Sequence, residues 1–424
     1  MTGTLKPAPI EAGEARRIFA SLPPRASLAV AVSGGADSVA LMQLLARWAA
    51  EDGPRPRLHM LTVDHGLRPQ AADEARAVAA WAAGVGLDHT VLTANKPPPR
   101  SGIQAWARDL RLRLMGEWVV SHGAEGVVLA HHREDQAETL AMRLARGSGL
   151  AGLGAMRGEA VVGNLRLYRP LLGVARARLR ATLESLGQPW VEDPGNSDPC
   201  HERVRLRQAL AADGALAELG LAPTALAAAA GRLGRADAAI EHYVNRCLEV
   251  AATVDRSGYA TVDGKAFAAA PEEVRLRVLA RLIGWVGGGP PPRGAGLETL
   301  LADLGGRTAA TLGGCQVAHT KTGLLVCREL RNLEALRLSP GETAFWDGRF
   351  VLGLQGAAAP VDIRPLGLAG FAQARTVVAE LGNIPSRAGQ AIPGGFRGAD
   401  LTAPPVFSSK TAGERLGVEF YRGN

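Results

Sequence analysis

The segment of the sequence best suited to chemistry is a glycine-rich turn, SGGADS, which follows the apolar run Leu28–Val32. Its two glycines allow the backbone to approach a ligand closely, and the first amides of the helix expected after it carry a partial positive charge. Such a nest favours phosphate, so we expect the whole turn to contact a nucleotide: Ser33, Gly34, Gly35, Ala36, Asp37 and Ser38. The alternative is a plain glycine turn that Ser33 or Ser38 caps.

This turn lacks the Gly-Lys-Ser/Thr ending of a Walker A loop, in which a lysine clamps the terminal phosphates. Asp37 stands in place of that lysine, which indicates a pyrophosphate bridged by a metal ion, with Mg²⁺ as the expected ion. Asp135 is the second candidate ligand, because it follows a later strand of the same predicted sheet. For both aspartates the alternative is that the carboxylate only caps a helix N-terminus.

Short apolar runs alternate with longer helix-like segments through the first third of the chain. This alternation predicts an α/β domain with a parallel sheet and helices on both of its faces. Ligands of such sheets bind beyond the carboxyl ends of the strands. The expected strands are Leu28–Val32, Leu58–Val63, Leu87–Leu92 and Val127–Ala130, and the expected helices are Ser38–Ala50, Ala71–Gly84, Gln104–Ser121 and Asp135–Arg146.

Polar clusters follow three of these strands, at Ser33–Ser38, Asp64–Arg68 and His131–Glu138. Because the carboxyl ends of parallel strands meet at one rim, the three clusters are expected to converge on one site. Of the adjacent histidines, we predict that His131 contacts phosphate or substrate while its neighbour packs. Arg111 shares a helix face with Arg108 and is expected to neutralise ATP or RNA phosphates, although a solvated surface arginine is the alternative.

The string SGGxDS resembles the signature of the PP-loop ATP pyrophosphatases, which cleave ATP to AMP and pyrophosphate to adenylate a substrate. Further strings, in order and spacing over about residues 28–210, are similar to one branch, the tRNA(Ile)-lysidine synthetases. They are VDHGLR at Val63–Arg68, HHREDQAET from His131, RLARGSGL from Arg143, RPLL from Arg169, EDPGN from Glu192, and the arginines Arg203, Arg205 and Arg207. The chain departs from the family at Glu134 and Gly195, where aspartate and serine are usual.

The resemblance implies ATP-dependent conversion of the wobble cytidine of a tRNA(Ile) with a CAU anticodon to lysidine, with L-lysine as co-substrate. It also implies that the region from Glu192 closes on ATP, lysine and the cytidine, and we carry this role to Asn196 and Arg205. Asp135 and Glu138 lie three residues apart on one helix face, where they are candidates to orient the lysine ammonium group; a solvated acidic helix start is the alternative. The predicted catalytic set is Asp37, His131, Asp135, Glu138, Asn196 and Arg205.

Composition changes along the chain predict three domains. Residues 1–210 form the PP-loop catalytic domain, and the Ala/Leu-rich residues 211–290 form a small helical domain that binds tRNA. The breaker GGGPPPRGAG, at Gly287–Gly296, leads into a mixed α+β C-terminal domain at residues 291–424. The string from Thr311 to Glu329 is similar to the terminal domain of the family.

The overall composition sets the remaining expectations. A net charge of +7, from 48 basic and 41 acidic residues, permits an RNA partner without requiring one. The four cysteines form no CxxC pair, and no signal peptide or membrane span stands out, so we expect a cytoplasmic protein with structural thiols and no membrane partner. The oligomeric state is left open, a homodimer included.

Two other functions remain open from the sequence. One is another PP-loop adenylating activity on a tRNA or a small molecule, although the paired cysteines of thiolation enzymes and an amidase domain are both missing. The other is a non-catalytic RNA-binding protein on a decayed enzyme fold. The full set of candidate catalytic side chains argues against decay, because a binding protein has no chemical need for all of them.

Overall fold

The computed structural model describes residues 6–66, 70–94, 97–192, 200, 202–211, 214–407 and 415–421. The chain divides into two compact units, Met1–Asp237 and Ala238–Asn424, and each is described by itself. This division does not coincide with the expected boundaries at residues 210 and 290, so the three-domain organisation stays a prediction.

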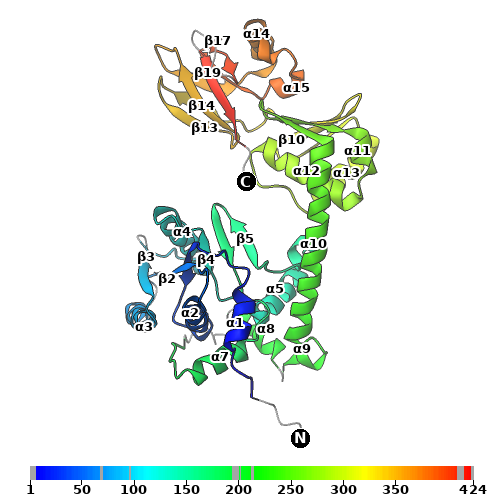
Figure 1. The fold of residues 1–424 in the computed structure, drawn as a ribbon. Coiled ribbons are helices and arrows are strands. Elements are labelled where there is room, and N and C mark those ends of the chain that lie inside the picture. Colours follow the sequence, from blue (N-terminus) through cyan, green and yellow to red (C-terminus); the bar gives the residue numbers. More distant parts are fainter. Residues whose placement is uncertain are drawn as a thin grey trace. The chain divides into compact units, whose positions relative to one another are not determined.

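The first unit is built on a six-stranded sheet with the strand order β3-β2-β1-β4-β6-β5 (Figure 1). All neighbouring pairs are parallel except the β5–β6 hairpin at one edge. The parallel α/β architecture predicted from the sequence is therefore confirmed, and only this hairpin lies outside the predicted strands. The strands are β1 (Ser27–Ala31), β2 (Arg57–Asp64), β3 (Asp88–Thr93), β4 (Gly126–Val128), β5 (Glu159–Val162) and β6 (Leu165–Tyr168).

Helices cover both faces of this sheet because alternate strand residues point to opposite sides. Leu28 and Val30 of β1 belong to a core that also contains residues of α1, α2, α3 and α7, whereas Ala29 belongs to a core shared with α4. The helices of this unit are α1 (Ala12–Phe19), α2 (Ala36–Ala49), α3 (Ala71–Gly84), α4 (Ile103–Ser121), α5 (Arg133–Ala145), α6 (Leu150–Leu153), α7 (Arg176–Ser185), α8 (Glu202–Leu210), α9 (Ala215–Glu218) and the start of α10 (Pro223–Ala251).

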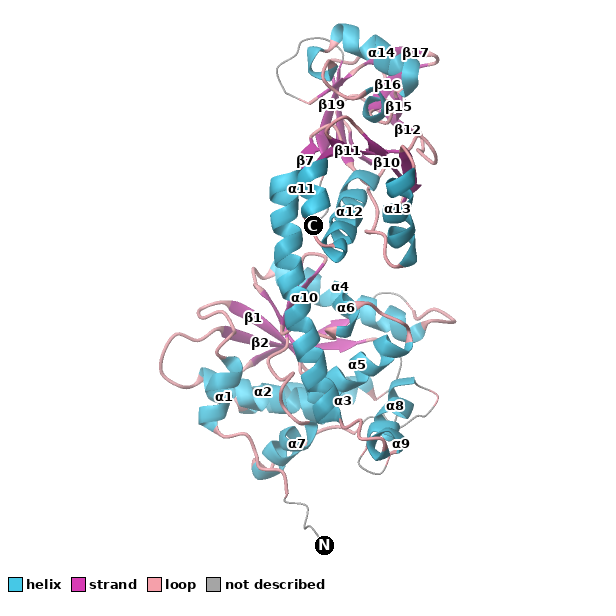
Figure 2. Cartoon of the chain, turned by 90° about the vertical axis from the view of Figure 1, so that its right-hand side faces the viewer, coloured by secondary structure: helices cyan, strands magenta, loops and turns pink. Residues whose placement is uncertain are grey.

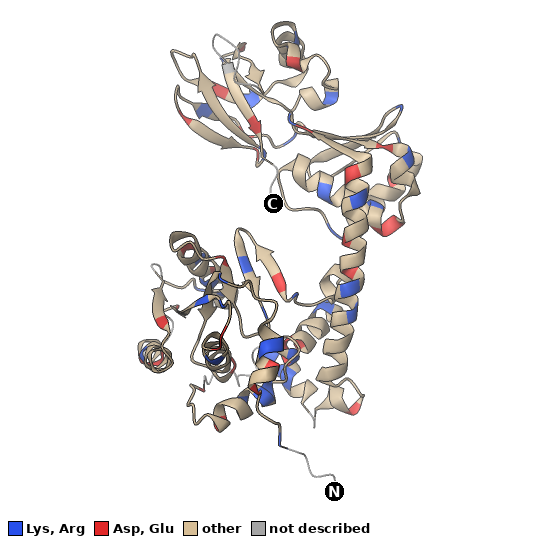
Figure 3. Cartoon of the chain, viewed as in Figure 1, with Lys and Arg blue, Asp and Glu red and all other residues tan. Residues whose placement is uncertain are grey.

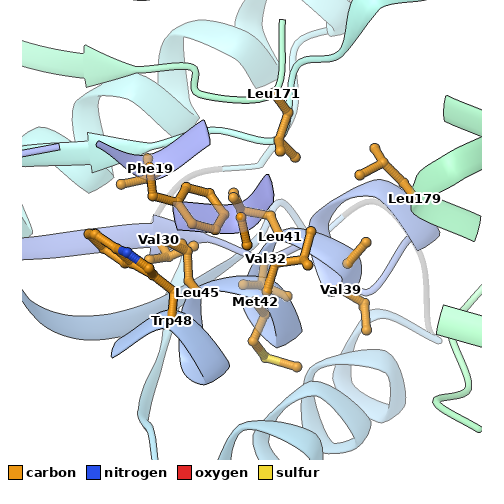
Figure 4. Close-up of a cluster of buried hydrophobic side chains, with 14 of the residues drawn as sticks. Phe19, Val30, Val32, Val39, Leu41, Met42, Leu45, Trp48, Leu171 and Leu179 are labelled. Carbon is orange, nitrogen blue, oxygen red and sulfur yellow. The ribbon is translucent and has the colours of Figure 1, made fainter. Parts of the chain in front are cut away.

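The larger core anchors the helix that follows the glycine-rich turn. Val39, Leu41, Met42 and Leu45 of α2 are fully buried, and Figure 4 shows them gathered with Val30 of the neighbouring strand. Burial of each such side chain contributes on the order of 1.5–3 kcal/mol. Apolar packing thus fixes the position of α2. Its polar N-terminal residues are not needed for this packing and can contact a ligand.

The sheets of the second unit are antiparallel except for the pair of β18 (Pro405–Val406) and β19 (Arg415–Phe420). A five-stranded sheet of order β7-β8-β11-β10-β9 shares one core with α11 (Gly264–Ala269), α12 (Glu272–Gly287) and α13 (Ala295–Gly306) (Figure 2). Its strands are β7 (Ala252–Asp255), β8 (Tyr259–Asp263), β9 (Ala309–Leu312), β10 (Cys315–His319) and β11 (Gly323–Arg328). The β7–β8 hairpin interrupts the stretch that the sequence predicts as wholly helical, and the Gly/Pro-rich stretch joins α12 to α13 within this one core.

Two four-stranded sheets complete the unit, in the orders β12-β15-β16-β17 and β13-β14-β19-β18. Their elements are β12 (Leu336–Leu338), β13 (Thr343–Trp346), β14 (Phe350–Gln355), β15 (Val361–Pro365), α14 (Gly367–Val377), the 3₁₀ turn η2 (Ala379–Leu381), α15 (Ser386–Gly389), β16 (Pro393–Arg397), β17 (Asp400–Ala403), β18 (Pro405–Val406) and β19 (Arg415–Phe420). The mixed α+β character expected for the C-terminal region is confirmed. Across the described ranges of the chain, no helix has the length and apolar character needed to cross a membrane.

Candidate active site

A cavity of about 280 Å³ opens in the first unit beyond the carboxyl ends of β1, β2 and β4. Its wall contains most of the site residues predicted from the sequence, together with side chains from α7 and α8. Convergence of the turn after β1 with the segment after β4 follows from the parallel neighbours in the sheet. The predicted residues in the wall are Ser33, Gly35, Ala36, Asp37, Ser38, Arg111, His131 and Asp135.

The glycine-rich turn is held by its own serine and by a distant segment. Gly34 has a φ of +86°, a left-handed conformation that favours glycine. The Ser38 hydroxyl accepts a hydrogen bond from the Ser33 amide at 3.1 Å and donates to the Gly35 carbonyl at 2.9 Å, and the Val191 amide donates to the Gly34 carbonyl at 2.9 Å. No side chain caps the start of α2, so its first amides remain suited to an anion.

Asp37 lies between cationic groups and keeps one oxygen unpaired. Its Oδ2 is 3.5 Å from Nε2 of His132 and 3.4 Å from Nε of Arg176, while its buried Oδ1 has no hydrogen-bond partner among the described residues. Burial by itself raises the pKa of Asp37, but the contact with His132 and the charges of Arg176 and Arg180 outweigh it and lower the pKa. Asp37 is therefore a carboxylate in the cavity wall that keeps one acceptor oxygen unused.

The second histidine of the pair is the centre of an acidic group. His132 is 2% exposed, its Nδ1 is 3.1 Å from Oε2 of Glu134, and its Nε2 is 3.5 Å from Oδ2 of both Asp37 and Asp135. Burial lowers the pKa of this imidazole, but the three carboxylates together raise it to about 9. His132 is thus protonated near neutral pH. Its Nε2 lies beside both candidate metal ligands, Asp37 and Asp135.

His131 has the opposite environment. Its side chain lines the cavity, and its buried Nδ1 has no hydrogen-bond partner among the described residues. Burial, helped by the charges of Arg169, Arg203 and Arg108 and opposed by Asp135, lowers the pKa of His131 to about 4. The neutral ring has an unused nitrogen beside the cavity.

Asp135 has a structural contact as well as a place in the cavity wall. Its Oδ2 accepts a hydrogen bond from the His132 amide at 3.0 Å, so the carboxylate caps the N-terminus of α5. Helix capping is the alternative to metal binding that the sequence leaves open. The described residues contain no cluster of three or more metal-ligating side chains. Asp37 and Asp135 can therefore supply two carboxylates to a cation, and the remaining ligands must come from elsewhere.

Glu138 lies behind the cavity rather than in its wall. Its side chain is 1% exposed, and its Oε1 accepts a hydrogen bond from Nε of Arg207 at 2.8 Å. Arg203, one helical turn before Arg207, is 3.5 Å from the other carboxylate oxygen. Glu138 thereby holds Arg207, which does line the cavity.

Arg205 and Asn196 differ from the other predicted residues. Arg205 is exposed, and its Nη1 donates to the Cys200 carbonyl at 3.0 Å. Residues two apart on a helix point in different directions, whereas Arg203 and Arg207 are four apart and share a face. Asn196 lies outside the described residues. The catalytic roles expected for both residues stay predictions.

The cavity wall also contains side chains that the sequence-based prediction did not name as single site residues. His65 belongs to the predicted polar cluster Asp64–Arg68; its buried Nε2 has no hydrogen-bond partner among the described residues, and burial together with the charge of Arg111 lowers its pKa. Arg176 and Arg180 come from α7 and Arg207 from α8. Their spacing of four residues, Arg176 to Arg180 and Arg203 to Arg207, was a visible signal of shared helix faces.

Comparisons with known proteins show which family the chain is similar to. Residues 10–213 match the family model of a PP-loop domain. The chain is 38% identical to the tRNA(Ile)-lysidine synthase of Ruegeria pomeroyi, over 92% of this chain and 91% of that protein. It is 43% identical to the tRNA(Ile)-lysidine synthase of a Bradyrhizobium species, over 78% of this chain and 95% of that protein. Among solved structures, the U34-tRNA thiolase NcsA from Methanococcus maripaludis is similar over 53% of this chain and 78% of its own, with 15% identity and a TM-score of 0.44.

Proposed function

This chain belongs to the tRNA(Ile)-lysidine synthase family, and on that premise we propose how the cavity of the first unit carries out the reaction. The enzyme joins L-lysine to C2 of the wobble cytidine of tRNA(Ile) with a CAU anticodon, and ATP is converted to AMP and pyrophosphate. The observation that supports the proposal best is the convergence of the glycine-rich turn, Asp37, His131 and Asp135 on one cavity.

The reaction has two steps in which every leaving group is accounted for. First, the cytidine O2 attacks the α-phosphorus of ATP, the bond from that phosphorus to the bridging oxygen breaks, and pyrophosphate leaves. Second, the ε-amine of lysine attacks C2, the C2–O2 bond breaks, AMP leaves with that oxygen, and the nitrogen loses its extra proton. The base must leave its stack to expose C2, so the tRNA presents an extruded nucleotide.

ATP binds with its phosphates against the glycine-rich turn. The uncapped first amides of α2 supply donors, and the partial positive charge of the helix N-terminus favours the anion. The apolar part of the cavity wall, which includes Leu61, Val63 and Met115, suits the flat face of the adenine base. Arg111 extends into the same cavity as a further cation for phosphate.

Asp37 and Asp135 are the residues that would hold Mg²⁺. The unpaired Oδ1 of Asp37 fits a cation, and two carboxylates completed by phosphate oxygens and water form the ligand set that Mg²⁺ prefers. When bound, the ion supplies neutralisation of the phosphate charge that develops as pyrophosphate leaves. The remaining side chains position the reactants.

The other side chains of the site have distinct positions relative to the substrates. His131 presents an unused ring nitrogen for a contact with the cytidine or with phosphate. Asp135 lies in the cavity wall, where its carboxylate can bind the lysine ammonium group. Glu138 acts indirectly, because it holds Arg207. Asn196 and Arg205 keep the roles that the family resemblance implies.

The rest of the chain is assigned to the tRNA body. Figure 3 shows basic residues distributed over both units, several of them on α10, rather than concentrated in one block. Contacts of this kind bind phosphates without reading sequence, so the affinity for tRNA decreases as salt increases. A cytoplasmic location and a homodimer complete the proposal, the first because the substrates are tRNA, ATP and lysine and the second as an expectation for a sizing experiment.

The proposal is tested by incorporation of labelled L-lysine into a tRNA(Ile) transcript with a CAU anticodon, in the presence of ATP and Mg²⁺. The control transcript carries a uridine in place of the anticodon cytidine. Label that depends on ATP and on the cytidine supports lysidine synthesis. Absence of label, with pyrophosphate released on another substrate, overturns the assignment to this reaction and favours another PP-loop activity.

A further inference from the structure

Two arginines on α7 line the cavity without a role in the mechanism above. Arg176 and Arg180 are one helical turn apart and share a face, and within the part of the chain that the structure describes the Nε of each is buried without a hydrogen-bond partner. Arg178, between them, points the other way and forms a bidentate pair with Glu14 at 2.6 Å on both oxygens. The helix therefore separates a structural arginine from two that face the cavity.

The start of α7 is fixed relative to the acidic group of α5. Oε2 of Glu134 accepts a hydrogen bond from the Arg176 amide at 2.9 Å, and the Arg133 amide donates to the Val174 carbonyl at 2.9 Å. These bonds hold the Arg176 guanidinium beside Asp37, with Nε 3.4 Å from Oδ2. A phosphate chain that begins at the glycine-rich turn therefore has a preset cationic partner on α7.

Arg180 already holds an anion on this side of the cavity. Its Nη2 donates to Oε1 of Glu192 at 3.0 Å, and the Trp190 indole donates to the same oxygen at 2.9 Å. Both members of the Arg180–Glu192 pair are partly exposed, so the pair is weak and can exchange. A phosphate oxygen carries more charge than a carboxylate oxygen and accepts the same bidentate geometry from a guanidinium.

We propose that Arg176 and Arg180 form a clamp for the β- and γ-phosphates of ATP and then for the departing pyrophosphate, with Arg180 exchanging Glu192 for phosphate. This inference rests on the proposed function, because it assigns the leaving group of its first step. As the bond to the α-phosphorus breaks, negative charge grows on the bridging oxygen of the pyrophosphate. Fixed guanidinium groups stabilise that charge without reorganising.

The test measures the KM for ATP and the inhibition constant of added pyrophosphate in Arg180→Ala, during lysidine formation. Loss of a charged hydrogen-bonding partner should raise both constants about 10-fold or more, while the KM values for lysine and tRNA stay within about twofold. Arg47→Ala, which removes an exposed arginine of α2 outside the cavity, is the matched control and should leave all constants unchanged.

Glu192→Gln should change the KM for ATP and the pyrophosphate inhibition constant in the opposite direction. The amide keeps an acceptor for the Trp190 indole but loses the charge that competes for Arg180, so both constants should fall by about 1.5–5-fold. The clamp is overturned if Arg180→Ala has the same KM for ATP and the same pyrophosphate inhibition constant as Arg47→Ala, with a thermal midpoint equal to that of the wild type. The exchange of Glu192 for phosphate is overturned if Glu192→Gln changes neither constant. Failure of the wild type to release pyrophosphate with tRNA(Ile) would instead count against the proposed function.

Discussion

Two ionic side chains, Asp37 in the first unit and Arg349 in the second, are arranged in opposite ways. Around the cavity of the first unit, buried polar atoms have no hydrogen-bond partner among the described residues, among them Oδ1 of Asp37 and Nδ1 of His131. In the second, Arg349 is 1% exposed yet donates to Asp347 at 2.7 Å and to the Ala391 carbonyl at 3.1 Å, with its guanidinium 4.7 Å from the Phe350 ring centre. A buried polar atom without a partner costs free energy, so a group of them marks a place where a ligand completes the structure.

The largest effect expected from this comparison is at Asp37. In Asp37→Ala, lysidine formation should fall by at least about 1,000-fold, because the first unit loses the carboxylate that we propose faces the phosphates and the metal. Binding of tRNA, measured by filter binding, should stay within about twofold. Asp37→Asn keeps the shape without the charge and should be nearly as inactive; full turnover in either variant would disprove the metal assignment.

The next largest effect is a loss of stability when the buried Arg349 of the second unit is removed. Arg349→Ala removes the hydrogen bonds to Asp347 and Ala391 and leaves a space beside Phe350, so the unit should lose about 3 kcal/mol. Asp347 keeps Arg328, with both bonds at 3.1 Å, which limits the loss. Hydrogen exchange of peptides from residues 238–407 measures it.

Arg337→Ala is the matched control, since its pair with Asp362, at 3.7 Å, is exposed. It should change stability by less than about 0.5 kcal/mol. Equal protection in the two variants would show that burial does not distinguish these pairs. Neither variant should alter the KM for ATP, because both residues belong to the second unit.

A smaller effect separates two arginines of α8. Arg207→Ala should lower kcat/KM for lysine by about 30-fold or more, because Arg207 lines the cavity and its loss leaves the buried Glu138 with Arg203, at 3.5 Å, as its remaining cation among the described residues. Arg205→Ala should stay within about twofold, since Arg205 is exposed. If the two variants lose activity equally, the helix face does not determine the role, and the family-based choice of Arg205 stands.

The sequence predicted the first unit well because its signals are local. Strands β1 to β4 and helices α2 to α5 lie within a few residues of their predicted ranges, since apolar alternation and glycine breaks specify each element. Parallel pairing then brings the ends of β1, β2 and β4 together, which is why the glycine-rich turn, His131 and Asp135 could be assigned to one site.

Other features depend on information that the sequence does not display. The choice between Arg205 and Arg207 depends on where α8 begins and on which face it turns to α5, and both are set by tertiary packing with Glu138. The β7–β8 hairpin was missed because Ala/Leu-rich helical stretches flank it, although Thr, Val and Tyr in its strands favour β-structure. Its pairing with β11 cannot be seen in the sequence. The proposed phosphate clamp of α7 depends on which of its arginines face the cavity, and the sequence does not show this.

The smallest effect concerns the backbone of the glycine-rich turn, where Gly34 and Gly35 are adjacent but not equivalent. An added Cβ at Gly34 would meet Val78 at 3.4 Å and Val191 at 3.5 Å, which are ordinary contacts, so the cost of Gly34→Ala comes from its φ of +86° and should be about 1–2 kcal/mol. Gly35 has a φ of −70° and its Cβ would meet only the Ser33 hydroxyl oxygen, at 3.7 Å. Gly35→Ala should therefore keep or slightly raise stability, by at most about 1 kcal/mol. Hydrogen exchange of the peptides that span β1 and α2 measures both variants without ATP, and equal loss in the two would show that space around the turn, rather than backbone conformation, requires the glycines.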